Sequence, residues 1–160
     1  MDNSFHLSRL IGRVASIQRT CLRLALRENP GIEPEWYYLL FSIDERSEVR
    51  KTDIISYNLT LEPTTGIDIL NRMISAGLLE ERTDPKDGRA RLLRLTKQGA
   101  STLKKASQQA QKVARLLYGD NSASPTIKML EDIEKTFGPI LMEQKPKTLS
   151  DLHPFYLLDI

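Results

Sequence analysis

A change of hydrophobic period within the chain limits the folds that this sequence can adopt. Up to Gly77 the apolar residues recur every three or four positions, which is typical of helices with one buried face. The stretches Leu78–Thr83 and Arg91–Leu95 have the pattern of strands, and the run at 84–90 between them contains the turn-forming residues proline, aspartate and glycine. The helical period returns after Thr96. The sequence therefore predicts a mainly helical chain with one β-hairpin.

Helices are expected to begin near residues 5, 33, 52, 64, 97 and 125. Thr52 and Thr96 are suited to cap the helices that follow them, and Gly77 is suited to end the helix before the hairpin. The two short helices before Gly77, joined by a turn of three to four residues, form a helix-turn-helix pattern. A hairpin directly after that pattern is the order of a winged helix.

The helices are expected to bury one apolar face each. The predicted inward-facing residues of the inner helices are Trp36, Leu39, Leu40, Ile43, Ile54, Ile55, Leu59, Ile67, Leu70, Met73, Ile74, Leu103, Ala106, Ala110, Val113 and Leu117. The first helix has a heptad stripe of Leu7, Leu10, Val14, Ile17, Cys21 and Leu24, and the last helix has Ile127, Leu130, Ile133, Phe137 and Leu141. An isolated winged helix would leave these terminal stripes unburied, so they predict a homodimer.

The charges are unevenly distributed, although 23 basic and 21 acidic side chains in 160 residues give a formal net charge of only +2. Residues 1–27 carry +4, residues 28–81 carry −7, and residues 82–105 carry +6. The +6 stretch surrounds the expected hairpin, which favours a polyanion as partner. No apolar run approaches the roughly 20 residues that cross a bilayer, and no signal peptide is visible, so a cytoplasmic protein without a membrane partner is expected.

Patterns of catalytic chemistry are missing from the sequence. There is no phosphate-binding loop, nucleophile elbow or dinucleotide fingerprint, so neither an enzyme nor a cofactor is expected. His6 and His153 lie near opposite ends of the chain without a cysteine or acid cluster beside them, so no metal site is expected.

Two stretches of the sequence resemble regulators of the MarR family. Thr64–Leu79, with the sequence TTGIDILNRMISAGLL, resembles the recognition helix and first strand of that family. Asp84–Arg89 (DPKDGR), followed by Leu95–Gly99 (LTKQG), resembles its wing and the start of its next helix. The similarity is strongest from Thr52 to Gly99, and the flanking helices match in order and length. The combination of Gly-Leu, Asp-x-Arg and Leu-Thr-x-x-Gly at these separations makes the resemblance specific.

The resemblance implies a homodimeric winged helix-turn-helix transcriptional regulator. It divides the chain into an N-terminal dimerisation helix (1–31), a DNA-binding domain (32–98), and C-terminal dimerisation helices with a tail (99–160). In such proteins the recognition helix enters the major groove of double-stranded DNA and a wing arginine enters the minor groove. A pseudo-palindromic operator is expected, because a two-fold protein reads two-fold DNA. Many members release DNA when a small aromatic or phenolic effector fills a cleft, so a ligand-responsive repressor is expected.

Carried over by position, the resemblance places on or near the groove face Thr64, Thr65, Ile67, Asp68 and Arg72. It places Arg89 at the wing tip and makes Asp87 the acid that braces the wing. Lys86, Arg91 and Lys97 are suited to phosphates by their charge. The full set of expected DNA contacts is Lys51, Thr52, Thr64, Thr65, Asp68, Arg72, Lys86, Arg89 and Arg91. Two alternatives stay open at this point: Thr64 as a helix cap, and Arg72 in a salt bridge with Asp84 or Asp87.

The sequence departs from the family pattern on the recognition helix. Ile67-Asp68 stands where a Thr-Arg pair is expected, and Gly66 stands where a β-branched residue is usual, at a cost of about 1 kcal/mol in helix stability. The carboxylate of Asp68 either repels phosphates or accepts from a cytosine amino group. The alternative function is therefore a winged-helix protein-interaction module with weak or lost DNA binding.

The candidate effector site consists of Arg13, Trp36, Tyr37 and Tyr38. The aromatic side chains are suited to line an apolar cleft and Arg13 to face an anionic ligand, although Trp36 at helical spacing favours a core position. One branch of the family senses peroxides through a lone cysteine in its first helix, which makes Cys21 a candidate redox residue with Tyr37 and Tyr38 assisting. Its heptad position favours a buried, inert thiol instead.

Overall fold

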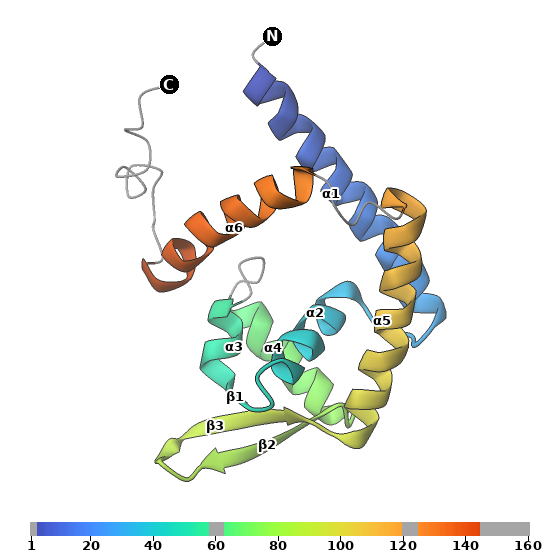
Figure 1. The fold of residues 1–160 in the computed structure, drawn as a ribbon. Coiled ribbons are helices and arrows are strands. Elements are labelled where there is room, and N and C mark those ends of the chain that lie inside the picture. The colour runs from blue at the N-terminus through green and yellow to red at the C-terminus, as the bar shows by residue number, and fades with distance from the viewer. Residues whose placement is uncertain (1–2, 58–62, 120–124, 145–160) are drawn as a thin grey trace. The chain divides into compact units, whose positions relative to one another are not determined.

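The computed structural model describes residues 3–57, 63–119 and 125–144. The chain divides into two compact units, residues 1–120 and residues 121–160. The described elements of the first unit are α1 (Asn3–Glu28), α2 (Pro34–Asp44), β1 (Val49–Arg50), α3 (Lys51–Tyr57), α4 (Pro63–Ser75), β2 (Leu79–Asp84), β3 (Asp87–Leu95) and α5 (Lys97–Tyr118). The second unit contributes α6 (Pro125–Gln144). A mainly helical chain with a hairpin after a helix-turn-helix is confirmed (Figure 1).

The junction between the hairpin and α5 is fixed by three residues of the Gly-Leu and Leu-Thr-x-x-Gly motifs. Gly77 has a φ of 72°, a left-handed conformation that ends α4 and that glycine adopts without a Cβ penalty. Thr96 caps α5 by accepting from the Gly99 amide, and its hydroxyl donates to the Gly77 carbonyl at 2.6 Å. At Gly99 a Cβ would collide with the Leu78 carbonyl oxygen. The motif therefore joins α4, β2 and α5 at one close backbone contact.

The sheet has three antiparallel strands in the order β1-β3-β2. β2 and β3 form the wing hairpin, with Glu81 opposite Leu93 and Asp84 opposite Asp87. The turn is therefore tighter than the predicted run at 84–90, because β3 already begins at Asp87. The short strand β1, which pairs Val49 with Leu93, was not predicted, since two residues carry no alternating pattern.

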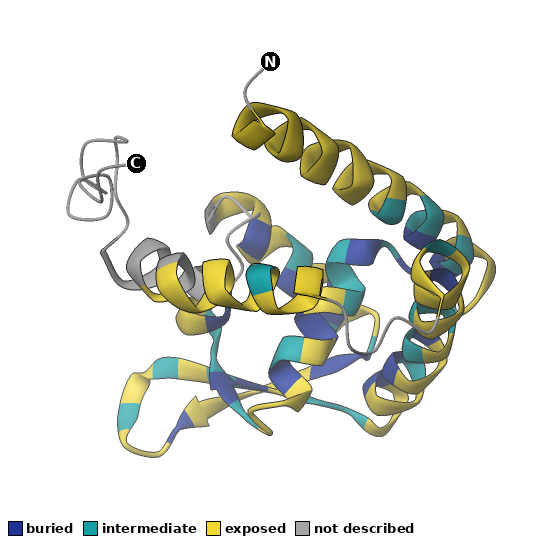
Figure 2. Ribbon diagram, turned by 45° about the horizontal axis from the view of Figure 1, so that its top comes forward, coloured by how far each residue is buried: buried dark blue, intermediate teal, exposed yellow. Residues whose placement is uncertain are grey.

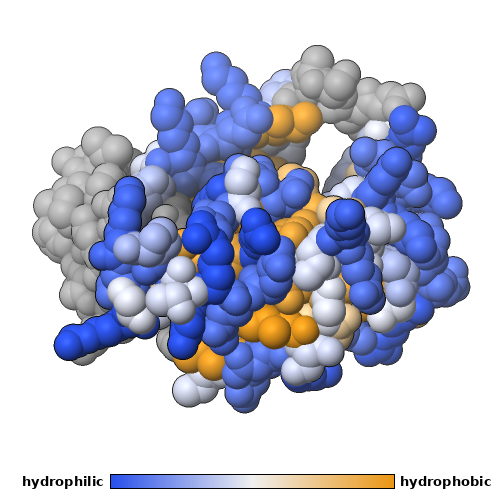
Figure 3. Space-filling view, turned by 90° about the horizontal axis from the view of Figure 1, so that it is seen from below, coloured by the Kyte–Doolittle hydropathy of each residue, from blue (hydrophilic) through white to orange (hydrophobic). Residues whose placement is uncertain are grey.

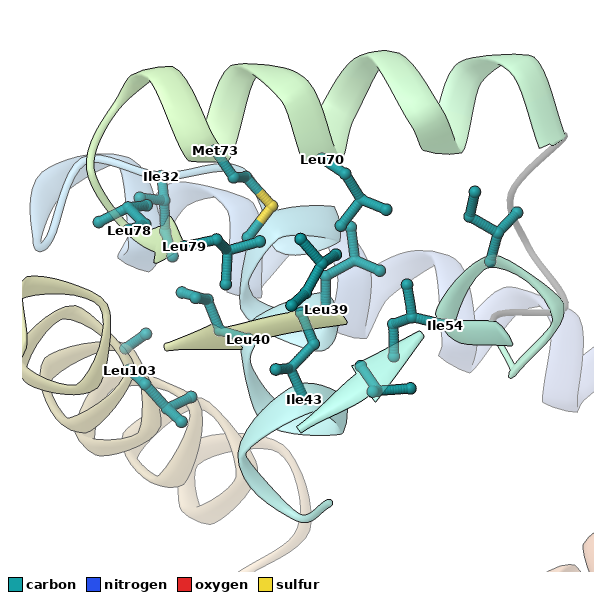
Figure 4. Packing of buried hydrophobic residues seen from close by; sticks show 14 of the residues in the cluster. Ile32, Leu39, Leu40, Ile43, Ile54, Leu70, Met73, Leu78, Leu79 and Leu103 are labelled. Carbon is teal, nitrogen blue, oxygen red and sulfur yellow. The ribbon is translucent and has the colours of Figure 1, made fainter. Parts of the chain in front are cut away.

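A single apolar core lies between α2, α4, the sheet and α5. Leu70 and Met73 of α4 point toward Leu39 and Leu40 of α2 and toward Leu79 of β2 (Figure 4). Leu39, Leu40, Leu70 and Met73 have no exposed surface, which confirms the predicted inner faces of these helices. Burying aliphatic side chains of this size stabilises a fold by roughly 1.5–3 kcal/mol each. The core thus fixes the orientation of α4 against the wing.

Two predictions about these helices are wrong in detail, and a third lies outside the described residues. Ile67 was expected to face inward, but it is 43% exposed, because the close approach of α3 and α4 is occupied by Gly66. A Cβ on Gly66 would lie 3.2 Å from two side-chain carbons of Ile55, so a β-branched residue would not fit without displacing Ile55. Thr52 does not precede α3, which starts one residue earlier at Lys51, so Thr52 lies in the first turn. The expected inward side chain of Leu59 lies outside the described residues.

The helix α1 has two different halves. Near its C-terminal end Leu22 and Leu26 are buried, whereas Cys21 is half-buried and Leu24 is 61% exposed, so the predicted heptad stripe does not define the buried face there. In the N-terminal half every residue of the predicted stripe is exposed, and Figure 2 shows this part of α1 yellow throughout. α1 packs along α5, where Tyr118 donates to the Gln18 side chain at 2.6 Å.

The helix α6 is described by itself. Ile127, Leu130 and Ile133 lie at the predicted helical spacing and are each at least 41% exposed. Pro139 lies inside the helix, which the sequence reading had not anticipated. The side chains of Phe137 and Leu141, and the whole of His153, lie outside the described residues. None of the described helices has a stretch long and apolar enough to span a bilayer.

Candidate nucleic-acid interface

An open hollow of about 490 Å³ lies where α3, α4 and the wing meet. Its lining brings together side chains that are far apart in the sequence. They are Arg50, Lys51, Thr52, Ile55, Ile67, Asp87, Arg89, Ala90 and Arg91. Five of the expected site residues therefore share one surface depression with Ile67: Lys51 and Thr52 from α3, and Asp87, Arg89 and Arg91 from β3.

The wing turn is held by two carboxylates. Asp84 is buried and accepts from the Lys86 amide at 2.8 Å and from the Arg50 guanidinium at 2.9 and 3.1 Å. The amide hydrogen bond and then the guanidinium lower the pKa of Asp84. Asp87 accepts from the Arg89 amide at 3.1 Å and lies 3.8 Å from the same Arg50 guanidinium. Arg50 therefore connects β1 to both ends of the wing turn, and Arg89 lies just after that turn in β3.

Arg50 was missed by sequence reasoning. The wing acids were considered as partners of Arg72, but Arg72 instead lies over the Trp36 ring, 5.8 Å from its centroid. The sequence gives no sign of this role of Arg50, because the strand that places it beside Asp84 is only two residues long and has no recognisable pattern. Trp36 itself is half-buried and packs against the core, and it is not among the residues that line the hollow near Tyr37 and Tyr38.

The side chains of Lys86 and Arg89 at the wing tip have no ion pair or hydrogen bond to any residue that the structure describes. Both residues are exposed. Their charges are therefore available to an external anion, since only the backbone amides of these two residues are used to shape the turn.

Other basic side chains of the +6 stretch are already paired with acids. Arg82 donates to both carboxylate oxygens of Glu48 at 2.6 Å, and Arg94 donates to Glu80 at 2.6 Å. The Arg82 hydrogen bonds lower the pKa of Glu48. These acids contribute to the −7 of residues 28–81, so part of that negative charge is neutralised within the chain. Figure 3 views the molecule from below, where hydrophilic side chains surround a hydrophobic area.

Lys51 and Arg91 share one acid, Glu81. The Lys51 ammonium lies 2.7 Å from a Glu81 oxygen and 2.7 Å from the Asn71 amide oxygen, which ties the start of α3 to α4 and β2. The Arg91 guanidinium lies 3.7 Å from the other Glu81 oxygen and donates to the Thr83 hydroxyl. For these two residues, a contact with DNA would require phosphates to compete with Glu81.

The outer face of α4 carries the remaining candidates. Thr64, Thr65, Asp68 and Arg72 are all exposed, on the opposite side from the buried Leu70 and Met73. Asp68 has no hydrogen bond or ion pair within the described part of the chain, even though Arg72 follows it at the spacing of an i,i+4 pair. The structure thus places on this face a carboxylate that has no partner among the residues it describes.

The expected effector residues are brought together only in part. Tyr37 and Tyr38 line a hollow of about 460 Å³ between α1, α2 and α5, together with Phe41, Gln18, Leu22 and residues of α5. Burial raises the pKa of Tyr38, so its phenol stays protonated at neutral pH. Trp36 and Arg13 do not line this hollow; Arg13 lies on the exposed N-terminal half of α1. Among the described residues no cluster of three or more histidine, cysteine or acidic side chains is suited to a metal ion.

Comparisons with known proteins define the class first. Residues 34–99 match the family model described as winged helix DNA-binding domain, and this range runs from the start of α2 to Gly99. The search of the curated proteins found no match.

Solved structures then define the fold over most of the chain. Sco3205, a MarR family transcriptional regulator from Streptomyces coelicolor in complex with DNA, has a TM-score of 0.74 at 20% identity, covering 88% of this chain and 89% of its own. A mutant MarR from E. coli complexed with operator DNA has a TM-score of 0.69 at 23% identity, covering 81% and 92%. A MarR family regulator from Rhodococcus sp. RHA1 has 0.71 at 18%, covering 86% and 96%. The chain has the winged helix-turn-helix fold of MarR-family transcriptional regulators, and the predicted resemblance is confirmed.

Proposed function

We propose that this protein is a homodimeric transcriptional repressor that binds a pseudo-palindromic operator and releases it when an effector occupies the hollow between α1, α2 and α5. The observation that carries the DNA-binding part is the wing tip. Lys86, in the turn held by Asp84 and Asp87, and Arg89, just after it in β3, are exposed and unpaired among the described residues, and Arg89 lines the same hollow as Ile67 of α4. An arginine beside such a turn is suited to the negative potential of a minor groove.

The dimer is supported by the exposed stripe of α1. Leu7, Leu10, Val14 and Ile17 are each at least 42% exposed on one side of the helix. A stripe of this length exposes more apolar surface than isolated surface leucines do, and a second copy of the same helix would cover it. In a dimer, two wings and two α4 helices would meet successive grooves about one helical turn apart.

The effector part is supported by the chemistry of the hollow. Its volume of about 460 Å³ is within the range of small-molecule sites, and Tyr37, Tyr38 and Phe41 give it an aromatic wall. The ring centroids of Tyr37 and Tyr38 are 5.4 Å apart. An aromatic or phenolic molecule would stack on these rings and form a hydrogen bond with the protonated hydroxyl of Tyr38.

The DNA-binding part is tested by the affinity of the purified full-length protein for DNA fragments from upstream of its own coding sequence, at several salt concentrations. Arg89→Ala should weaken specific binding by about tenfold or more, in line with roughly 1–3 kcal/mol for a base-contacting arginine. Lys112→Ala, which removes one exposed charge from α5, is the matched control and should bind like the wild type. An affinity that does not change with salt, or with Arg89→Ala, would contradict the proposal.

A further inference from the structure

The outer face of α4 has an acid at its centre. Three of the inward positions of this helix are Gly66, Leu70 and Met73, which are buried. At 3.6 residues per turn, Asp68 lies almost opposite all three, so its carboxylate is at the middle of the outward surface. Ile67, beside it, is 43% exposed and lines the hollow between α3, α4 and the wing.

The neighbours that would neutralise Asp68 are engaged elsewhere. Arg72, one turn later, lies over the Trp36 ring instead of pairing with Asp68. Asn71, also one turn later, accepts from Lys51, whose ammonium is shared with Glu81. Glu48, Glu80 and Glu81 each have a basic partner in the wing or α3, but Asp68 has none among the described residues. The carboxylate is therefore left for whatever docks on this face.

A free carboxylate on a surface that approaches DNA is repelled by phosphates and by most base edges. In the major groove, guanine presents two acceptors and thymine presents an acceptor and a methyl group. Adenine has an amino donor beside the N7 acceptor, whereas the only major-groove group of cytosine is its amino donor. An exposed aliphatic side chain favours thymine instead, since its favourable partner in the groove is the thymine methyl.

We propose that Asp68 and Ile67 determine the base preference of each operator half-site: Asp68 selects a cytosine by accepting from its amino group, and Ile67 selects a nearby thymine by contact with its methyl. This inference rests on the proposed DNA-binding function and adds the base chemistry that the α4 face recognises. The selection works largely by rejection, because a wrong base leaves the carboxylate against an acceptor.

The test is selection of binding sequences from a random duplex pool by the full-length wild type, Asp68→Asn and Asp44→Asn. The wild type should enrich a site with a cytosine in each half. Asp68→Asn should replace that cytosine by adenine, since asparagine pairs with the amino group and N7 of adenine, and should bind the wild-type site about tenfold or more weakly. Asp44→Asn makes the same charge change at the exposed end of α2 and should enrich the wild-type site.

The contribution of Ile67 is measured by comparing duplexes that differ only in the thymine methyl group. Replacing the selected thymines by deoxyuridine should weaken wild-type binding by about fourfold per half-site, the value for burying one methyl group. Ile67→Ala should bind the two duplexes equally. Thermal unfolding of each variant reports whether the fold is kept. We expect it to be kept, because the side chains of Asp68 and Ile67 are both exposed.

The outcomes separate the inference from the function beneath it. If the wild type enriches no sequence, the proposed function and the inference both fail. If the wild type enriches a palindromic site that Asp68→Asn enriches unchanged, DNA binding stands and the assignment to Asp68 is overturned. Equal sensitivity of the wild type and Ile67→Ala to the missing methyl would overturn the assignment to Ile67.

Discussion

The winged helix-turn-helix buries its apolar residues within the chain, whereas the N-terminal half of α1 leaves its apolar residues exposed. In the former, Leu39, Leu40, Leu70 and Met73 are fully buried against one another and the sheet. In the latter, Leu10 and its neighbours in the stripe remain exposed along one side of a helix. The first region is complete within one chain, whereas the second needs a further surface to cover it. The winged helix-turn-helix is thus the part of the sequence that specifies the tertiary fold, and the stripe of α1 is the part for which we propose association with a second copy.

The largest effect is expected from filling the close backbone contact between Gly99 and Leu78 in the winged helix-turn-helix of residues 34–99, which is called the head below. Gly99→Ala would drive a Cβ into the Leu78 carbonyl oxygen, and a backbone atom cannot rotate away. We expect a loss of about 3 kcal/mol in the free energy of unfolding, the upper end of what overpacking costs. Chemical denaturation measures it.

Gly66→Ala is the control for that substitution. Its Cβ would lie 3.2 Å from carbons of the Ile55 side chain, which can shift, and alanine also improves helix propensity by about 1 kcal/mol. The change in stability should therefore stay within about 1 kcal/mol. If Gly66→Ala lowers the free energy of unfolding as much as Gly99→Ala does, the close contact with the Leu78 carbonyl does not explain the effect of Gly99→Ala.

A charge in the stripe of α1 should affect association and leave the head folded. Val14→Asp places a carboxylate among the exposed apolar residues and should weaken the dimer by about 2 kcal/mol per chain, the value of one buried aliphatic side chain. Sedimentation velocity should show a shift toward monomer, with thermal unfolding of the head retained. Ser8→Asp puts the same charge on another side of α1 and should leave the mass unchanged.

Removing the charge from Asp84, the buried carboxylate at the wing turn, should have a smaller effect, which depends on pH. The pKa of Asp84 is lowered in the folded protein, so its stabilisation is present above the unfolded pKa near 4 and is lost as pH falls through the folded value. Asp84→Asn should therefore be less stable than the wild type at pH 7, and the difference should begin to shrink as pH falls below about 4. Thermal unfolding between pH 7 and pH 3 tests this, and a constant difference across that range would contradict it.

The smallest effect is expected at an exposed ion pair of the wing. Arg94 and Glu80 have side chains that are 55% and 48% exposed, and solvent screens such pairs. Arg94→Ala should change the free energy of unfolding by less than about 0.5 kcal/mol, as measured by urea denaturation. A loss several times larger would mean that the pair holds the strands together, and the wing would then depend on surface charge more than on the core.

Much of the head could be predicted because its signals are local. Gly77, Thr96 and Gly99 mark the ends of elements by backbone conformation and capping, which need no knowledge of the rest of the chain. The change from helical to strand period placed the hairpin correctly, although the turn proved tighter.

The candidate site could be predicted only in part, because its geometry is nonlocal. Arg89 was identified from its motif, but Arg50 reaches Asp84 only through a strand of two residues. For Arg72 the sequence left open a DNA contact or a salt bridge with Asp84 or Asp87, and the structure places it over Trp36, because the sequence does not show which element lies beside that flank of α4. Ile67 was placed inward by periodicity and lies outward, because a glycine occupies the close approach to α3.

The sequence by itself determined the order of the helices and the hairpin, the winged-helix resemblance and the basic character of the wing, because composition, periodicity and capping act over a few residues. Only the tertiary structure decided which charges are free. It pairs Arg82, Arg94 and Lys51 with acids from distant segments and leaves Arg89, Lys86 and Asp68 without partners among the described residues. Pairing depends on which side chains the packed core brings within a few ångströms of one another, and that is a property of the assembled fold.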